Sequence, residues 1–178
     1  GVRHRDEGGP GPLVVATDRG EVGPCDFVVN ALWEGRVAVD ASRGLEPGAR
    51  WSHRYRVALF LRTRSPVTVP SSVVVTGPYG DVKAYSERDF YVSWYRPGLL
   101  AEGAGLAPPP VPRLTAEDCR RLQAEMLGEL GRIVRPVGQL AAAAEQVRVN
   151  GGWVFALGRG PLDDRRSTVH RRDRFGIR

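Results

Sequence analysis

Apolar residues alternate with other residues most regularly between residues 53 and 64. An apolar side chain stands at every second position from Tyr55 to Leu61, and arginines stand at both ends of the other series, at Arg54 and Arg62. Successive side chains of a strand point to opposite faces of its sheet. The alternation therefore predicts a long strand with one apolar face and a second face that is basic at its ends and apolar in the middle.

Residues 71–98 continue with short apolar runs divided by turn-forming residues. The pattern predicts strands at 72–76, 81–85 and 90–95, because Gly, Pro, Ser and Asp, which favour turns, separate these runs. Together with residues 53–64 they predict about four antiparallel strands, enough to form the body of a domain.

The period of the pattern changes after residue 114. Thr115 suits an N-cap, and Glu117 and Asp118 bring negative charge to the first turn of a helix. Apolar residues then recur every three or four positions, at Cys119, Leu122, Met126, Leu130 and Ile133. This spacing predicts one long helix with its apolar stripe toward the core, ended by Pro136.

Weaker patterns complete the prediction. Residues 34–45 suggest a helix, and residues 138–149 suggest either a second short helix or an irregular approach to a strand. The remaining ranges are expected to be a proline-rich loop at 99–113 and strands at 13–17, 25–33 and 153–157. The expected fold is α+β, with an antiparallel sheet of about five to seven strands and one long helix packed on it.

Composition supports a folded domain and adds a basic charge. Of the 178 residues, 42% are hydrophobic and 26% charged, which suits a packed core. The net charge is +6, and Lys83 is the only lysine, so arginine carries nearly all of the positive charge. The densest basic stretch, 161–178, is either a nucleic-acid footprint, a solvated tail, or a face that meets an acidic partner domain. We do not expect nucleic acid as the partner.

Several site types lack their required residues. The chain has three histidines but no Ser in a GxSxG sequence, so a hydrolytic Ser-His-Asp triad is not expected. No Cys or His spacing predicts a metal site, and no GxGxxG or Walker sequence predicts a phosphate cradle. No apolar run is long enough to span a membrane, and no signal peptide is evident, so a cytoplasmic setting is expected.

Aromatic residues gather between residues 90 and 96. Alternation places Tyr91, Ser93 and Tyr95 on one face of the predicted strand, with Phe90, Val92 and Trp94 on the other. The Trp94 face is expected to be core. The tyrosine face, together with Arg96, is either an ordinary half-exposed surface or the wall of a pocket for an organic substrate.

The segment LVVATDRGEVGPCDFVVNALW, residues 13–33, resembles a junction found in FAD-dependent oxidoreductases of the D-amino-acid oxidase-like (DAO) superfamily. There a hairpin precedes a D.VVNA strand that ends beside the flavin. The later segments HRYRVALFLR, FYVSWYRPG and GGWVFALGRG resemble the substrate domain of the same superfamily. Gly35 is the first glycine after the VVNA strand, later than is usual there.

The resemblance implies a division of the chain and a set of roles. Residues 1–33 would end the FAD-binding part, 34–160 would form the substrate-binding α+β domain, and 161–178 would lead back to an FAD-binding domain elsewhere in a longer chain. The cofactor implied is FAD, held by the parent protein and not by this piece alone, and the other partner is a small organic substrate. Implied contacts are Asn30, Ala31 and Trp33 to the flavin, and Tyr55, Tyr91, Tyr95, Arg96 and Arg172 to the substrate.

A second hypothesis needs no flavin. The chain could be a stand-alone α+β binding module whose basic end meets an acidic protein or nucleic acid, through Arg165, Arg166, Arg171 and Arg172. Which residues are catalytic is left open under either hypothesis.

Overall fold

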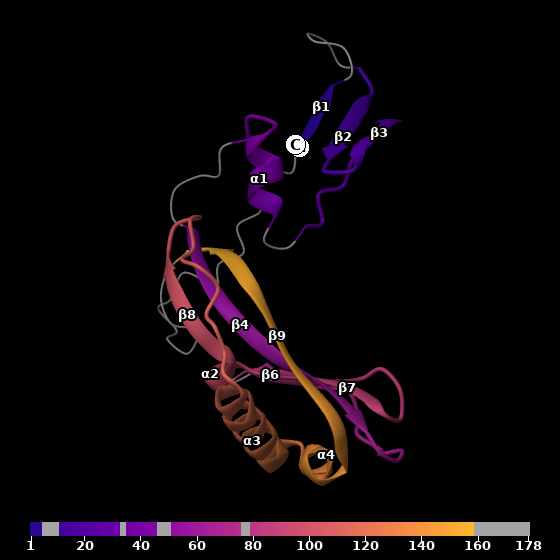
Figure 1. The fold of residues 1–178 in the computed structure, drawn as a ribbon, viewed down its shortest axis with the longest axis vertical. Coiled ribbons are helices and arrows are strands. Elements are labelled where there is room, and N and C mark those ends of the chain that lie inside the picture. The colour runs from indigo at the N-terminus through magenta and orange to yellow at the C-terminus, as the bar shows by residue number, and fades with distance from the viewer. Residues whose placement is uncertain (5–10, 33–34, 46–50, 76–78, 159–178) are drawn as a thin grey trace.

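The fold is α+β, as the sequence predicts, with a six-stranded antiparallel sheet, a separate three-stranded sheet and one long helix packed on the larger sheet (Figure 1). The structure is a computed structural model that describes residues 1–4, 11–32, 35–45, 51–75, 79–158 of the chain. The strands of the large sheet are β4 (Trp51–Thr63), β5 (Ser72–Val74), β6 (Gly80–Ala84), β7 (Asp89–Trp94), β8 (Leu99–Ala104) and β9 (Ala144–Leu157).

The large sheet is built around β4. Its strands run in the order β5-β6-β7-β4-β8, and β9 pairs with β4 along its other edge. β4 pairs with β9 from Trp51 to Thr63, so these two strands form the long axis of the sheet. On its opposite side β4 pairs first with β8 and then with β7. The alternating pattern that predicts β4 is confirmed over nearly its full length.

Thr115 is the N-cap of helix α3 (Ala116–Ile133), as predicted. The Thr115 side chain accepts a hydrogen bond from the backbone N–H of Asp118, and the Asp118 side chain accepts one from the backbone N–H of Thr115. This reciprocal capping box satisfies donors that a helix start leaves unpaired. The helix is followed by the 3-10 turn η1 (Arg135–Val137), which contains Pro136, and by α4 (Gly138–Ala143).

The hydrophobic core lies between α3 and one face of the large sheet. Fully buried side chains from the helix meet fully buried side chains from the strands, namely Leu122, Met126 and Leu130 against Leu59, Val92 and Trp94. Phe90 and Val92 share this face with Trp94, which confirms the predicted core side of β7. Figure 1 shows α3 and α4 on the same side of the sheet, so the opposite face is turned away from both helices.

Two elements differ from the prediction in the second half of the chain. β8 forms within the predicted loop 99–113, because Leu99–Ala104 pairs with the first half of β4. The final strand begins at Ala144 and not near residue 153, because β4 offers a partner along its whole length. For residues 138–149 the predicted short helix is confirmed only in the first half, where α4 lies. Both the formation of β8 and the early start of β9 depend on pairing with the distant strand β4, and local sequence propensity does not reveal such pairing.

The smaller sheet consists of β1 (Val2–His4), β2 (Leu13–Thr17) and β3 (Gly20–Cys25), in that order. β2 confirms the predicted strand at 13–17, and β3 lies mostly between the strands predicted at 13–17 and 25–33. Helix α1 (Arg36–Ala41) is shorter than the predicted 34–45. In Figure 1 the small sheet and α1 lie beyond the β8 end of the large sheet. The Arg36 guanidinium carbon lies 5.5 Å from the centroid of the Trp51 ring, a cation–π contact between α1 and β4.

The strand predicted at 25–33 is wrong for its described part. Residues 27–32 have no regular secondary structure, and the side chains of Phe27 and Val29 are 89% and 86% exposed. An apolar run becomes a strand only when neighbouring strands accept its backbone hydrogen bonds and cover its side chains. The described residues supply no such neighbour for this segment.

Candidate functional site

The candidate site lies on the face of the large sheet that is turned away from α3 and α4. We call this the open face, and it carries Arg54, Arg56 and Phe60 of β4, Asp81 of β6, and Tyr91 and Ser93 of β7. Strand alternation places these residues on it, since their neighbours Tyr55, Val57, Val82, Val92 and Trp94 enter the core. Polar and aromatic side chains thus meet on a surface whose reverse side is fixed by the core.

Arg56 is the centre of this arrangement. Its Nη2 donates a hydrogen bond of 2.8 Å to the Ser93 hydroxyl oxygen. Its guanidinium carbon lies 4.0 Å from the centroid of the Tyr95 ring, a cation–π contact. Burial lowers the pKa of Arg56, because water is excluded from part of the cation. The Nε atom of Arg56 is buried and has no hydrogen-bond partner among the described residues.

Asp81 joins the site across the neighbouring strand. It is paired with Ser93 in the β6–β7 register, so the two side chains share the open face. Burial raises the pKa of Asp81 above its ordinary value, and a hydrogen bond with Ser93 and the charge of Arg56 act in the opposite direction. Ser93 therefore lies between a half-buried cation and a half-buried carboxyl group.

A second arginine borders the site. Arg54 is 6% exposed, and its Nε lies 3.6 Å from a carboxylate oxygen of Glu102 on β8. Tyr95, the first residue of α2 (Tyr95–Gly98), lies near both arginines. Burial raises the pKa of the Tyr95 hydroxyl, and the charges of Arg54 and Arg56 act against that shift. The hydroxyl is consequently a neutral hydrogen-bonding group at neutral pH.

The open face continues toward a more exposed aromatic pair. The rings of Phe60 and Tyr91 meet edge to face, with centroids 5.3 Å apart. The structure therefore brings the predicted residues Tyr91 and Tyr95 to the same face. Arg96 follows Tyr95 in α2 and is exposed.

Tyr55 is placed apart from the other predicted substrate contacts. It is 7% exposed within the hydrophobic core, and its ring meets that of Trp153 edge to face at 5.2 Å. Tyr55 belongs to the apolar series of alternate residues in β4, and the side chains of that series point toward the core between the sheet and the helices. Tyr55 thus lies on the opposite face of the sheet from Tyr91. Arg172 lies outside the described residues.

The predicted flavin contacts are only partly described. The Asn30 side-chain amide donates to the Arg36 carbonyl oxygen at 3.0 Å and to an Asp40 carboxylate oxygen at 2.8 Å, so it holds the start of α1. Its own carbonyl oxygen accepts a hydrogen bond from the backbone N–H of Leu32. Ala31 is exposed, and Trp33 lies outside the described residues. Of the predicted flavin contacts, the described polar side chain, Asn30, is therefore engaged within its own segment.

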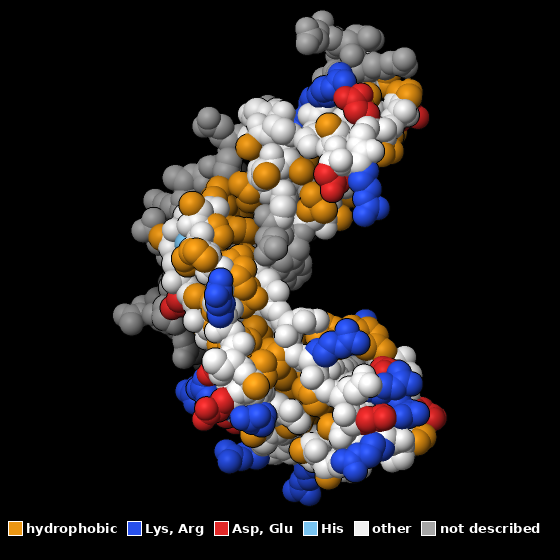
Figure 2. Space-filling model, viewed as in Figure 1, with side chains coloured by type: hydrophobic (Ala, Val, Ile, Leu, Met, Phe, Trp, Pro, Cys, Tyr) orange, Lys and Arg blue, Asp and Glu red, His pale blue; other side chains and the backbone are white. Residues whose placement is uncertain are grey.

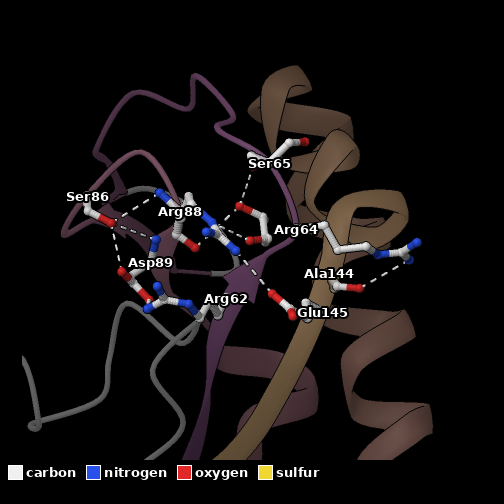
Figure 3. A network of polar contacts seen from close by, with 9 residues as sticks. Arg62, Arg64, Ser65, Ser86, Arg88, Asp89, Ala144 and Glu145 are labelled. Atoms are coloured by element: carbon white, nitrogen blue, oxygen red, sulfur yellow. Dashed lines mark hydrogen bonds and ion pairs between the residues drawn. The ribbon is translucent and has the colours of Figure 1, made fainter.

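A second polar cluster lies at the far end of β4 and is a structural network (Figure 3). Arg62 pairs with Asp89 at 2.9 Å, and Arg88 pairs with Glu145 at 3.1 Å. Arg88 Nε also donates to the Thr63 carbonyl oxygen at 2.8 Å. These contacts tie β4 to β7 and β9. Figure 2 shows Lys and Arg side chains gathered with acidic ones at the helical end of the molecule, and apolar side chains along its middle.

Sequence reasoning did not single out Arg56, Asp81 or Ser93 as site residues. Arg56 stands in the alternating series of β4, but its partners come from β6, β7 and α2, whose register the sequence does not give.

The basic residues of the second hypothesis, Arg165, Arg166, Arg171 and Arg172, lie outside the described residues. Among the described residues no helix is both long and apolar enough to cross a membrane.

Comparison of the chain with protein-family models, with curated proteins and with solved structures finds no significant match.

Proposed function

We propose that this chain is the substrate-binding portion of an FAD-dependent oxidoreductase of the DAO-like superfamily, which oxidises an amine or a hydroxy compound. The observation that carries the proposal is the open face, where Arg56, Tyr95, Ser93 and Asp81 form a half-buried polar and aromatic cluster. Such a mixture of aromatic walls and few convergent polar groups suits a small organic ligand.

The division of labour follows from the chemistry of flavoenzymes. The flavin supplies the electron-accepting chemistry, and the protein binds and orients the substrate. In this proposal the open face contributes binding, through the guanidinium of Arg56 and the ring and hydroxyl of Tyr95. The core behind β4 and β7 keeps these side chains in fixed positions, which favours a productive orientation.

The segment at residues 27–32 supports the proposal from a second direction. Phe27 and Val29 are nearly fully exposed, although the run in which they lie is as apolar as a buried strand. In the proposed enzyme an FAD-binding domain, outside the described residues, covers this segment and supplies the sheet into which it pairs. The flavin would be held by that domain.

Kinetics of the complete product of the gene that encodes this sequence test the proposal. Y95F and R56M are expected to raise KM for the oxidised substrate by about tenfold, equivalent to about 1.4 kcal/mol of binding. R62M, which changes an arginine of the structural network, is the matched control and should leave KM within about twofold. Unchanged KM in both Y95F and R56M would remove the open face from the site.

A further inference from the structure

Four side chains form a row that crosses the open face from strand to strand. Phe60 of β4 lies opposite Tyr91 of β7 on one side and opposite Arg148 of β9 on the other, and Lys83 of β6 lies opposite Tyr91. The order is therefore cation, ring, ring, cation, and we call these four residues the cross-strand row. Neighbouring strands are about 4.8 Å apart, so the row extends over roughly 14 Å.

The two rings of the cross-strand row can be reached from solvent without a cavity. Phe60 is 39% exposed, and Tyr91 is half-buried beside it, with the ring centroids 5.3 Å apart. Their sequence neighbours Leu59 and Val92 are fully buried on the reverse face, which holds the two strands in place. A third ring, that of Tyr85 directly after β6, is 58% exposed. Exposed rings on a rigid sheet suit stacking by planar groups.

The two cations of the row are available to an anion. Lys83 and Arg148 are exposed, and neither forms an ion pair among the described residues. The Nζ atom of Lys83 lies 5.0 Å from the centroid of the Tyr85 ring, so this cation stays beside the aromatic surface. An anion that binds Lys83 and Arg148 therefore displaces no carboxylate of the described chain.

The carboxyl groups of the open face do not cancel its positive charge. Asp89 pairs with Arg62 at 2.9 Å, and Asp81, two residues before Lys83 on β6, lies opposite Ser93. With every group ionised, basic side chains outnumber acidic ones on the described open face, with Arg54, Arg56, Arg62, Lys83 and Arg148 against Asp81, Asp89 and Glu102. The face thus attracts anions.

Two rings between two cations match the chemistry of single-stranded nucleic acid. Its bases are planar and free to lie on aromatic side chains, and its phosphates pair with lysine and arginine. A duplex keeps its base faces inside its own stack, so it offers this row only phosphates. We infer that the cross-strand row binds single-stranded nucleic acid, with bases stacked on Phe60 and Tyr91 and phosphates paired with Lys83 and Arg148.

The inference goes beyond the proposed function and does not depend on it. Phe60 stands four residues after Arg56 along β4, so the row lies roughly 13 Å from the centre of the substrate site. The basic stretch 161–178 lies outside the described residues and takes no part in the argument. A flavoenzyme and a protein of another class could both carry this second binding surface.

The test measures the fluorescence anisotropy of a labelled single-stranded oligonucleotide of about 12 nucleotides as the chain is added. A duplex of the same sequence is the comparison probe. We expect the single strand to bind at least about tenfold more tightly than the duplex, because only the single strand can stack its bases on the rings. The assay contains no flavin, so this inference and the proposed function can fail separately.

Variants of the rings test the stacking. F60A and Y91A should each weaken binding of the single strand by about fivefold or more. Y91F keeps the ring and should bind as the wild type does. The stretch 161–178 is the same in every variant, so its contribution to binding cancels in the comparison. Circular dichroism confirms that each variant is folded.

Variants of the cations test the phosphate contacts. K83Q and R148Q should each reduce the slope of log affinity against log salt concentration by about 0.7, the contribution of one phosphate contact to a single strand. R120Q is the charge-matched control, because Arg120 is an exposed residue of α3, on the other side of the sheet. It should leave the slope unchanged.

Several outcomes would overturn the inference. One is a folded wild-type chain that does not bind the single strand at low salt, and another is a duplex that binds as tightly as the single strand. F60A and Y91A that bind like the wild type would exclude stacking on the row. Equal slopes in K83Q, R148Q and R120Q would exclude its phosphate contacts.

Discussion

The indole N–H of Trp94 donates a hydrogen bond of 2.6 Å to a carboxylate oxygen of Glu129, which joins β7 to α3. Trp94 is 1% exposed, so its N–H would be buried without a partner if Glu129 were removed. The contact fixes the helix against the strand whose other face carries Ser93. The position of the candidate site thus depends on the packing behind it.

Substitution E129A is expected to lower the free energy of unfolding by about 1.5–3 kcal/mol, because it leaves a buried indole N–H unsatisfied. Urea denaturation followed by tryptophan fluorescence measures the change. E125A is the matched control, since Glu125 is an exposed residue one helical turn away, and it should change stability by no more than about 0.5 kcal/mol. Equal effects of the two substitutions would contradict the role assigned to Glu129.

Two glycines are expected to respond oppositely to alanine. A Cβ at Gly80 would collide with the Trp94 ring and the Ser93 carbonyl oxygen, whereas a Cβ at Gly128 on α3 would meet nothing within 4 Å. G80A should therefore destabilise the fold by several kcal/mol or prevent folding, and G128A should stabilise it by up to about 1 kcal/mol. Thermal denaturation of both variants checks the pair. A stabilising G80A would show that β6 and β7 are packed differently.

The capping box of α3 predicts a pH-dependent contribution to stability. Hydrogen bonds from the backbone and side chain of Thr115 lower the pKa of Asp118 below its ordinary value. A carboxyl group with a lowered folded-state pKa contributes stability above its unfolded pKa of about 4, and that contribution is lost as the pH falls through the folded value. D118N should thus be less stable than wild type at neutral pH, and the gap should close in acid.

Loss of the cap itself is a separate test. T115A should lower the free energy of unfolding at neutral pH by about 1 kcal/mol, because the N–H of Asp118 loses its acceptor. Chemical denaturation at neutral pH measures this change, with T115S as the variant that keeps the hydroxyl. An effect of T115S as large as that of T115A would argue against capping.

The sequence predicted those elements whose signal is local. The period-two series of β4 and the capped, amphipathic α3 were both recoverable, because each pattern reflects one element buried on one side. The face shared by Tyr91, Ser93 and Tyr95 was recoverable for the same reason.

The rest depended on contacts between distant segments. The sequence of β8 carries no clear strand signal, and β8 forms because it pairs with β4. Residues 27–32 carry a strand signal but have no pairing partner among the described residues. The Arg56 cluster combines three strands and α2, and a shift of one residue in the β6–β7 register would turn Asp81 away from Ser93. Such a register is a property of the assembled sheet.

The most direct test of the central claim, that this chain binds substrate for a flavin, is the absorption spectrum of the complete product of its gene. If the chain has this role, the complete product is a yellow protein with the visible bands of an oxidised flavin, and those bands are lost when an oxidisable amine or hydroxy compound is added without an electron acceptor. A folded, complete product that is colourless and contains no flavin after acid extraction would show that the chain does not bind substrate for a flavin.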